Sequence, residues 1–218
     1  MKKMSGTEFD NLVEFFDAMA QTKWLSAVHN QLKDLSGCWN NKTILDVGCG
    51  TGRLLERGIN EAEFLHGIDL SEAMIKKCHS LFSQYKSKAN YQFQVGDAYH
   101  LPLENERTDI ALSTCVMFLL PQPEKGIMEM LRVLKKGGKV VMLNPSPNMS
   151  PKSALQYANN HQINGFEREA LLKWSNVSTI RHRYYNEELT AILEQLKTSK
   201  IVHTPVLEGL ATITLAEK

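Results

Sequence analysis

The sequence contains few cysteines and no arrangement of them that marks a metal site or a disulfide framework. Four occur in 218 residues, at positions 38, 49, 78 and 115, and no two of them form a C-x-x-C pair. No histidine stands near them at the spacing of a zinc ligand set. We therefore expect neither structural zinc nor disulfides, and a reducing, cytoplasmic location.

Long apolar runs and an excess of one charge are also missing. No stretch approaches the roughly 20 apolar residues that a membrane helix needs, so we expect no membrane insertion. The opening MKKMSGTEFD has two lysines without a following apolar segment, which argues against a signal peptide. Lys plus Arg number 25 against 24 Asp plus Glu. Because nucleic-acid-binding domains are usually strongly basic, we expect no nucleic-acid partner.

Strands and helices alternate in the middle of the chain. Helices are predicted to begin at Ser71, a good N-cap, and at Pro123. Short apolar or alternating runs predict strands at residues 43–47, 63–69, 91–95, 109–116 and 139–143. This alternation predicts an α/β fold with a parallel sheet and helices on both faces.

The two flanks have helical periodicity and a closing hairpin. One amphipathic helix is predicted over residues 9–20 and a second over residues 24–35. We expect the basic and glycine-rich residues 135–138 to stop the helix that begins at Pro123. Later helices are predicted near residues 152–160, 167–176 and 187–197, and two strands near 200–206 and 210–216 that pair across Glu208-Gly209.

A glycine turn follows the first predicted strand, in ILDVGCGTGRLL at residues 44–55. The dinucleotide pattern G-x-G-x-x-G requires glycine at position 53 or 55, where the chain has Arg53 and Leu55. This mismatch disfavours a NAD-dependent oxidoreductase. The pattern that fits is D-x-G-x-G-x-G, from Asp46 to Gly52.

With this turn, and with acidic residues after the second and third strands, the chain resembles the class I S-adenosylmethionine-dependent methyltransferases. It is most similar to their small-molecule branch, the ubiquinone- and menaquinone-biosynthesis type (methyltransferase type 11). The resemblance covers residues 40–145 and includes LRVLKKGGKVVML. It implies a Rossmann-like, doubly wound, seven-stranded sheet, mostly parallel with an antiparallel C-terminal hairpin, and S-adenosyl-L-methionine as cofactor.

The same resemblance implies one domain over residues 1–218 and a role for each strand end. Residues 1–40 would form lid helices, 41–145 the cofactor-binding half, and 146–218 a substrate-side insert with closing strands. Asp46 would hold the cofactor's ammonium group, Asp69 the ribose hydroxyls and Asp97 the adenine amino group. The implied cofactor residues are Asp46, Gly48, Cys49, Gly50, Gly52, Asp69, Leu70, Met74, Asp97, Ala98 and Cys115.

The acceptor is expected between the N-terminal helices and the insert. Its nucleophile must approach the methyl group in line with the departing sulfur, and good positioning can suffice. We expect a small-molecule acceptor, with His182 as general base, beside Arg181 and Arg183, which suit an anionic group or a solvated surface. Its lining is expected to include some of Trp24, His29, His161, Trp174, His182, Tyr184 and Tyr185, although core packing explains the tryptophans and solvent exposure the histidines.

Several alternatives stay open. No carboxylate occurs in CVMFLLPQ after the fourth strand, so we expect no metal.

The sequence NPSP at residues 144–147 is similar to the Asn-Pro-Pro-aromatic motif of amine methyltransferases but follows the fifth strand, and we interpret it as a loop. An RNA or protein methyltransferase is one alternative function. A protein of this fold that binds the cofactor without transferring a methyl group is another.

Overall fold

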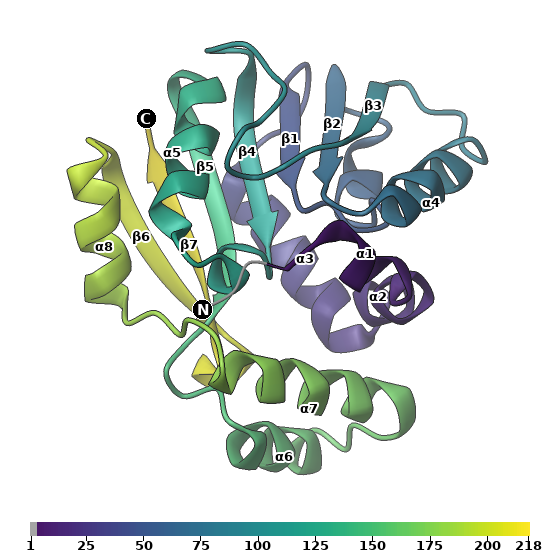
Figure 1. Cartoon of the computed structure of the whole chain (residues 1–218), viewed down its shortest axis with the longest axis vertical. Coiled ribbons are helices and arrows are strands. Elements are labelled where there is room, and N and C mark those ends of the chain that lie inside the picture. The colour runs from purple at the N-terminus through teal and green to yellow at the C-terminus, as the bar shows by residue number, and fades with distance from the viewer. Residues whose placement is uncertain (1–3) are drawn as a thin grey trace.

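The computed structural model describes residues 4–218, which form a seven-stranded sheet with helices around it (Figure 1). Lys2 and Lys3, the two lysines of the opening stretch, lie outside the described residues. The strand order is β3-β2-β1-β4-β5-β7-β6. The strands are β1 (Thr43–Val47), β2 (Phe64–Asp69), β3 (Asn90–Val95), β4 (Thr108–Thr114), β5 (Leu134–Pro145), β6 (Ser199–Val206) and β7 (Ala211–Glu217).

The pairing of the strands confirms the predicted fold class. Strands β1 to β5 run parallel, and β7 is antiparallel to both β5 and β6. The β6–β7 hairpin turns at Leu207–Gly209, where the sequence predicted it. Because β2 lies on one side of β1 and β4 on the other, the strand order reverses here and a crevice is expected at their carboxyl ends.

Helices cover both faces of the sheet and the carboxyl ends of its strands. In Figure 1, α5 and α8 lie in front of the sheet, α3 extends behind it, and the α6–α7 pair lies beyond its lower end. Ser71 caps α4 as predicted, because its hydroxyl accepts the Met74 N–H at 3.1 Å. The helices are α1 (Gly6–Asp10), α2 (Val13–Ala20), α3 (Lys23–Ser36), α4 (Glu72–Phe82), α5 (Pro123–Val133), α6 (Pro151–Asn160), α7 (Gly165–Thr179) and α8 (Asn186–Gln195).

Two local predictions are wrong. The helix predicted over residues 9–20 is divided into α1 and α2, because the Leu12 N–H bonds to the Phe9 carbonyl in a tighter turn. The helix that begins at Pro123 ends at Val133, before residues 135–138 as predicted, but the strand predicted over residues 139–143 begins already at Leu134 and bulges. Leu134 pairs with Thr108 and Lys139 with Ile110, so five steps of β5 match two of β4.

The centre of the sheet provides a rigid base for the site. Ile44 and Leu45 of β1 and Ala111 and Leu112 of β4 have no exposed surface. Burying each large aliphatic side chain of this kind stabilises a fold by about 1.5–3 kcal/mol. Residues that follow these strands are therefore held at defined positions.

Candidate functional site

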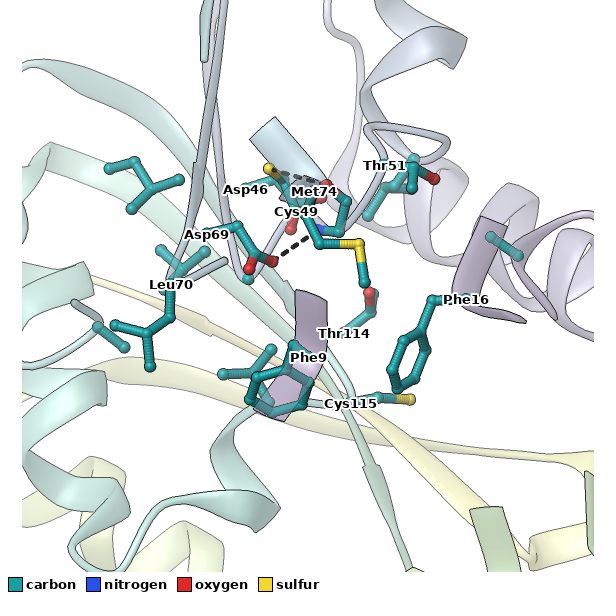
Figure 2. A pocket seen from close by; sticks show the side chains of 18 of the residues that line it. Phe9, Phe16, Asp46, Cys49, Thr51, Asp69, Leu70, Met74, Thr114 and Cys115 are labelled. Carbon is teal, nitrogen blue, oxygen red and sulfur yellow. Dashed lines mark hydrogen bonds between the residues drawn. The ribbon is translucent and has the colours of Figure 1, made fainter. Parts of the chain in front are cut away.

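A pocket lies at the carboxyl ends of β1, β2 and β4 (Figure 2). The acidic side chains that end three strands of the sheet all reach it, although they are far apart in the sequence. Of the predicted cofactor residues, all except Gly52 line this pocket: Asp46, Gly48, Cys49, Gly50, Asp69, Leu70, Met74, Asp97, Ala98 and Cys115. These residues form what we call the sheet wall of the pocket.

The glycine turn has a backbone that only glycine adopts without strain. Gly48, Gly50 and Gly52 have φ angles of +75°, +54° and +84°. A Cβ atom at Gly48 would lie 2.1 Å from Cγ2 of Val116, whereas one at Gly50 would meet no atom of the described residues within 4 Å. The Gly50 backbone thus faces open space in the pocket. Gly52 instead packs against Phe82, behind the turn.

Asp46 has the most unusual electrostatic environment in the pocket. The residue is 1% exposed, and its Oδ1 atom has no hydrogen-bond partner among the described residues. Burial, and secondarily the nearby charge of Asp69, raises the pKa of Asp46 to about 8. An ionised carboxylate in such a place requires a compensating cation, which a positively charged ligand could supply.

Asp69 connects the glycine turn to the start of α4. Its Oδ2 accepts the Gly50 N–H at 2.9 Å and its Oδ1 accepts the Ser71 N–H at 2.9 Å (Figure 2 shows the first of these bonds). Burial raises the pKa of Asp69 to about 6, although the backbone N–H groups of Ser71, Gly50 and Leu70 act in the opposite direction. Each oxygen has a further lone pair for a ligand hydroxyl.

The remaining sheet-wall residues combine one acid with apolar surface. Asp97 follows β3 and accepts the Tyr99 N–H at 2.9 Å. Leu70 and Met74 line the pocket after β2, and Ala98 lines it after β3. Flat apolar surface between two carboxylates is suited to a nucleoside, whose ring is apolar on its faces and polar at its edges.

Cys115 closes the sheet wall after β4. It has a φ angle of +59°, which is uncommon for a residue other than glycine, and its N–H bonds to the Leu143 carbonyl at 3.0 Å. Burial raises the pKa of the Cys115 thiol to about 12. The thiol is therefore neutral at physiological pH.

A second wall is contributed by the N-terminal helices and is almost entirely apolar. Figure 2 shows Phe9 and Phe16 beside the same pocket as Asp46 and Asp69. Sequence reasoning expected this segment to cover the acceptor but named only Trp24 and His29 of it as candidate lining residues, because core and pocket stripes have the same periodicity. This lid wall consists of Met4, Phe9, Phe16, Met19, Ala20, Leu25 and His29.

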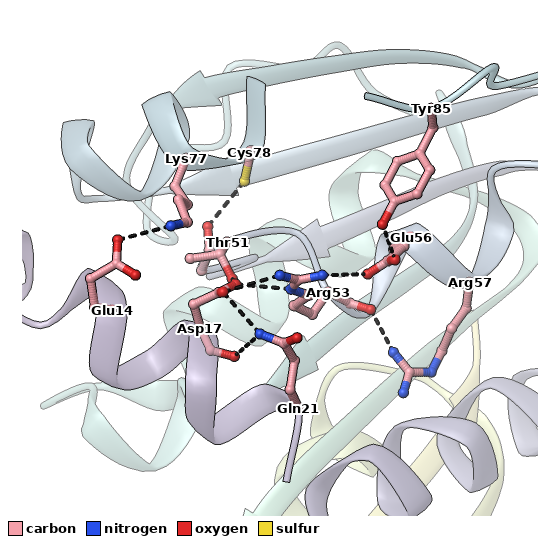
Figure 3. Close-up of polar contacts among 11 residues, drawn as sticks. Glu14, Asp17, Gln21, Thr51, Arg53, Glu56, Arg57, Lys77, Cys78 and Tyr85 are labelled. Atoms are coloured by element: carbon pink, nitrogen blue, oxygen red, sulfur yellow. Dashed lines mark hydrogen bonds and ion pairs between the residues drawn. The ribbon is translucent and has the colours of Figure 1, made fainter. Parts of the chain in front are cut away.

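The N-terminal helices that carry the lid wall are attached to the glycine turn by a polar network around Asp17 (Figure 3). Asp17 of α2 accepts hydrogen bonds from Thr51 Oγ1 at 2.8 Å and from Arg53 Nε and Nη2 at 2.9 and 3.0 Å. Burial raises the pKa of Asp17, but the hydrogen bonds from Arg53 and Thr51 outweigh it and the net pKa is lowered. Helix α2 is thus bonded directly to the glycine turn.

Two further contacts hold the lid against α4. The Ser71 hydroxyl donates to Asp10 Oδ1 at 2.6 Å, where α1 meets the start of α4. Glu14 pairs with Lys77 at 2.8 Å, and the Glu14 side chain is 82% exposed. The first contact is part-buried and the second is at the surface, so we expect the second to contribute little.

Of the residues expected to line the acceptor site, His29 lines the pocket and the others do not. Trp24 and Trp174 stack on each other with centroids 5.8 Å apart, and the Trp24 N–H donates to the Glu167 carbonyl. These tryptophans join α3 to α7 as packing residues. His161 pairs with Glu208 at the surface, 2.8 Å away.

The structure does not bring His182 to the pocket. Its N–H bonds to the Phe118 carbonyl, and its ring stacks on Tyr184 in a separate hollow that Arg181 and Arg183 also line. Tyr185 is 59% exposed. Because His182 lines this separate hollow and not the pocket, its predicted role as general base in the pocket has no geometric support.

Residues 4–218 contain neither a cluster of potential metal ligands nor a helix that could span a membrane. In that range, no three or more His, Cys, Asp or Glu side chains gather as a metal ion would require. Over the same residues, every helix is too short or too polar to cross a lipid bilayer.

Comparison with known proteins gives consistent matches. A family model described as a methyltransferase domain matches residues 39–197. Demethylmenaquinone methyltransferase of Desulfitobacterium hafniense (strain Y51) is 34% identical over 112 residues, which are 50% of this chain and 44% of that protein. The chain spans less than half of the length of several curated relatives that it matches.

Solved structures share the fold at low identity. A SAM-dependent methyltransferase from Aquifex aeolicus superposes with a TM-score of 0.70 at 17% identity, over 95% of this chain and 97% of that chain. The [4+2]-cyclase SpnF superposes with a TM-score of 0.62 at 19% identity, over 98% of this chain and 94% of that chain. The fold is therefore found in proteins with different reactions.

Proposed function

The chain belongs to the methyltransferase domain family, and on that premise we propose that it transfers the methyl group of S-adenosylmethionine to a small-molecule acceptor. The cofactor, when bound, supplies a methyl group activated by a positively charged sulfur. One observation carries the proposal: the pocket contains a buried carboxylate oxygen of Asp46 without a hydrogen-bond partner among the described residues.

The charges of the pocket fit this cofactor better than a dinucleotide. S-adenosylmethionine carries a cationic ammonium group, a cationic sulfonium group and one carboxylate, a net charge of +1, whereas a dinucleotide carries two anionic phosphates. Asp46, Asp69 and Asp97 line the pocket. Three carboxylates attract the first ligand and repel the second, so the electrostatics and the glycine spacing favour the same ligand.

The acids and glycines of the sheet wall each have a role in the proposal. Asp46 accepts from the ammonium group, and the turn at Gly48 and Gly50 allows the backbone to approach the methionine end. Asp69 accepts from the ribose hydroxyls with its remaining lone pairs. Asp97 accepts from the adenine amino group.

The acceptor is proposed to be a small molecule because the side chains that the N-terminal helices contribute to the pocket are almost all apolar. A relative of the chain is named for demethylmenaquinone, a small acceptor. The balanced net charge of +1 and the apolar lid wall do not favour a polyanionic RNA.

Two measurements test the proposal. Calorimetry with S-adenosylmethionine and, separately, NAD(H) should give binding of the first only, weakened in Asp46→Asn and unchanged in Asp34→Asn, a control on the exposed face of α3. A screen with labelled methyl donor over phenols, amines and thiols should then give a methylated product. Binding of NAD(H) alone contradicts the cofactor; tight binding without any methylated product favours a non-methylating protein of this fold.

A further inference from the structure

The lid wall and the sheet wall offer a ligand very different charges. Among the described residues that line the pocket, the acids Asp46, Asp69 and Asp97 all belong to the sheet wall. The lid-wall side chains are apolar apart from His29. An acceptor that reaches past the cofactor therefore meets hydrocarbon and a single imidazole.

The cation that lines the pocket is already neutralised. Within residues 4–218, Arg53 is the lining residue with a permanent positive charge. Its Nε and Nη2 donate to the two oxygens of Asp17 at 2.9 and 3.0 Å, and its Nη1 donates to Glu56 at 3.2 Å (Figure 3). An anionic acceptor would find no free cation among these residues and would face the carboxylates of the sheet wall.

His29 is buried with a ring nitrogen that lacks a partner. It is 4% exposed, and its Nδ1 has no hydrogen-bond partner among the described residues. Burial, and secondarily the charge of Arg57, lowers the pKa of His29 to about 3, so the ring is neutral. Arg57 lies in the short 3-10 helix Leu55–Gly58 and donates hydrogen bonds to Ser26 Oγ and Asn30 Oδ1 of α3. A neutral imidazole can donate through one nitrogen and accept through the other.

We infer that the acceptor is an uncharged molecule, apolar except for a hydroxyl or amine group that hydrogen-bonds to His29. This inference rests on the proposed function and specifies its substrate class. The apolar body packs on side chains such as Phe9 and Phe16, and the polar group satisfies a nitrogen that would otherwise be buried without a partner. Carboxylated or phosphorylated acceptors are disfavoured because the described residues that line the pocket offer them no unpaired cation.

Matched pairs of acceptor probes test the charge preference. The pairs are 4-methylcatechol against 3,4-dihydroxybenzoate, and 4-methylaniline against 4-aminobenzoate, titrated into protein saturated with S-adenosylhomocysteine. The uncharged member of each pair should bind more tightly by on the order of a hundredfold, because an unpaired carboxylate is costly to bury. Equal or tighter binding of the carboxylates, or no binding of any uncharged probe, overturns the inference.

Substitution at His29 tests its contact with the acceptor. In His29→Phe, the KM or Kd for the uncharged probe should rise by roughly tenfold, the value of one hydrogen bond. His29→Asn should restore part of the affinity, while the affinity for S-adenosylhomocysteine should be unchanged in both. His161→Phe, at the surface beside Glu208, is the matched control. Unchanged probe affinity in His29→Phe, or an equal loss of cofactor affinity, overturns the assignment.

If the His29 variants fail to fold, a cation introduced into the lid wall provides an independent test of the charge preference for the acceptor. Ala20 lines the pocket at the end of α2 and is partly exposed. Ala20→Lys should shift the preference toward the carboxylated probes. If S-adenosylhomocysteine does not bind, the proposed function fails; if it binds but wild-type protein prefers carboxylates, the acceptor inference alone fails.

Discussion

The sheet wall and the lid wall face one pocket but are held in different ways. The sheet wall follows directly from strands of the sheet, of which β1 and β4 are almost entirely buried, and its acids stand at or just after strand ends. The lid wall belongs to the N-terminal helices, of which α1 and α2 are short and are attached to the rest of the molecule by polar contacts around Asp17 and Asp10. The charged wall suits a cofactor that carries cationic groups, and the apolar wall suits an acceptor with an apolar body.

The largest expected effect comes from a side chain added to the sheet wall at Gly48. Gly48→Ala would place Cβ 2.1 Å from Val116 Cγ2 at a φ of +75°. Left-handed strain and overpacking together should cost about 3 kcal/mol of unfolding free energy. Calorimetry should record a Tm lower by roughly 6–12 °C.

Gly137→Ala is the matched control for this change. Gly137 has a φ of +74°, but a Cβ there meets no atom of the described residues within 4 Å. The control includes the backbone strain without the collision, and should lose only about 1–2 kcal/mol. Equal losses in the two variants would mean that contact with Val116 is unimportant.

The next effect concerns the charge of the sheet wall. Asp46→Asn should weaken binding of S-adenosylmethionine by about 2 kcal/mol, a charge-assisted hydrogen bond, without destabilising the empty protein. If Asp46 instead stabilised the fold through an ion pair, Asp46→Asn would lower the Tm. A fall of the Tm with unchanged cofactor affinity would show that Asp46 is structural.

The lid attachment should have a smaller effect on stability. Asp17→Ala removes the acceptor of three hydrogen bonds from Thr51 and Arg53 and should cost about 2 kcal/mol, with loss of acceptor affinity as the lid loosens. Glu14→Ala breaks an exposed ion pair with Lys77 and should change stability by less than about 0.5 kcal/mol. Chemical denaturation of both variants measures the difference, and similar values would contradict a special role for Asp17.

The pH dependence of the empty protein should report on the sheet wall. The folded pKa of Asp46, about 8, lies above its ordinary value of 3.8, so folding favours the protonated carboxyl. Stability is then full below the ordinary pKa and is lost as the pH rises through about 8. Asp69, with a pKa of about 6, adds loss of the same sign at lower pH. Asp46→Asn should have a flatter Tm profile between pH 6 and 8.

The comparison of the walls also explains what the sequence could predict. Asp46 and Asp69 lie at the ends of strands, and the glycines follow the first of them directly. Because parallel strands bring their carboxyl ends to one edge of the sheet, local sequence patterns were enough to predict that these residues share a site. His182 was expected at the pocket because its loop was assumed to cover the cofactor, but that depends on how α7 and α8 dock. The break between α1 and α2 and the bulge after Leu134 are likewise set by tertiary pairing.

The most direct test of the account is the number of protons released when S-adenosylmethionine binds. Calorimetric titration at pH 7 in buffers of different ionisation enthalpy measures it. Because Asp46 is protonated in the empty pocket and ionised beside a cation, wild-type protein should release about one proton and Asp46→Asn almost none. Equal proton release by the two proteins would contradict binding of the cofactor's cation at Asp46.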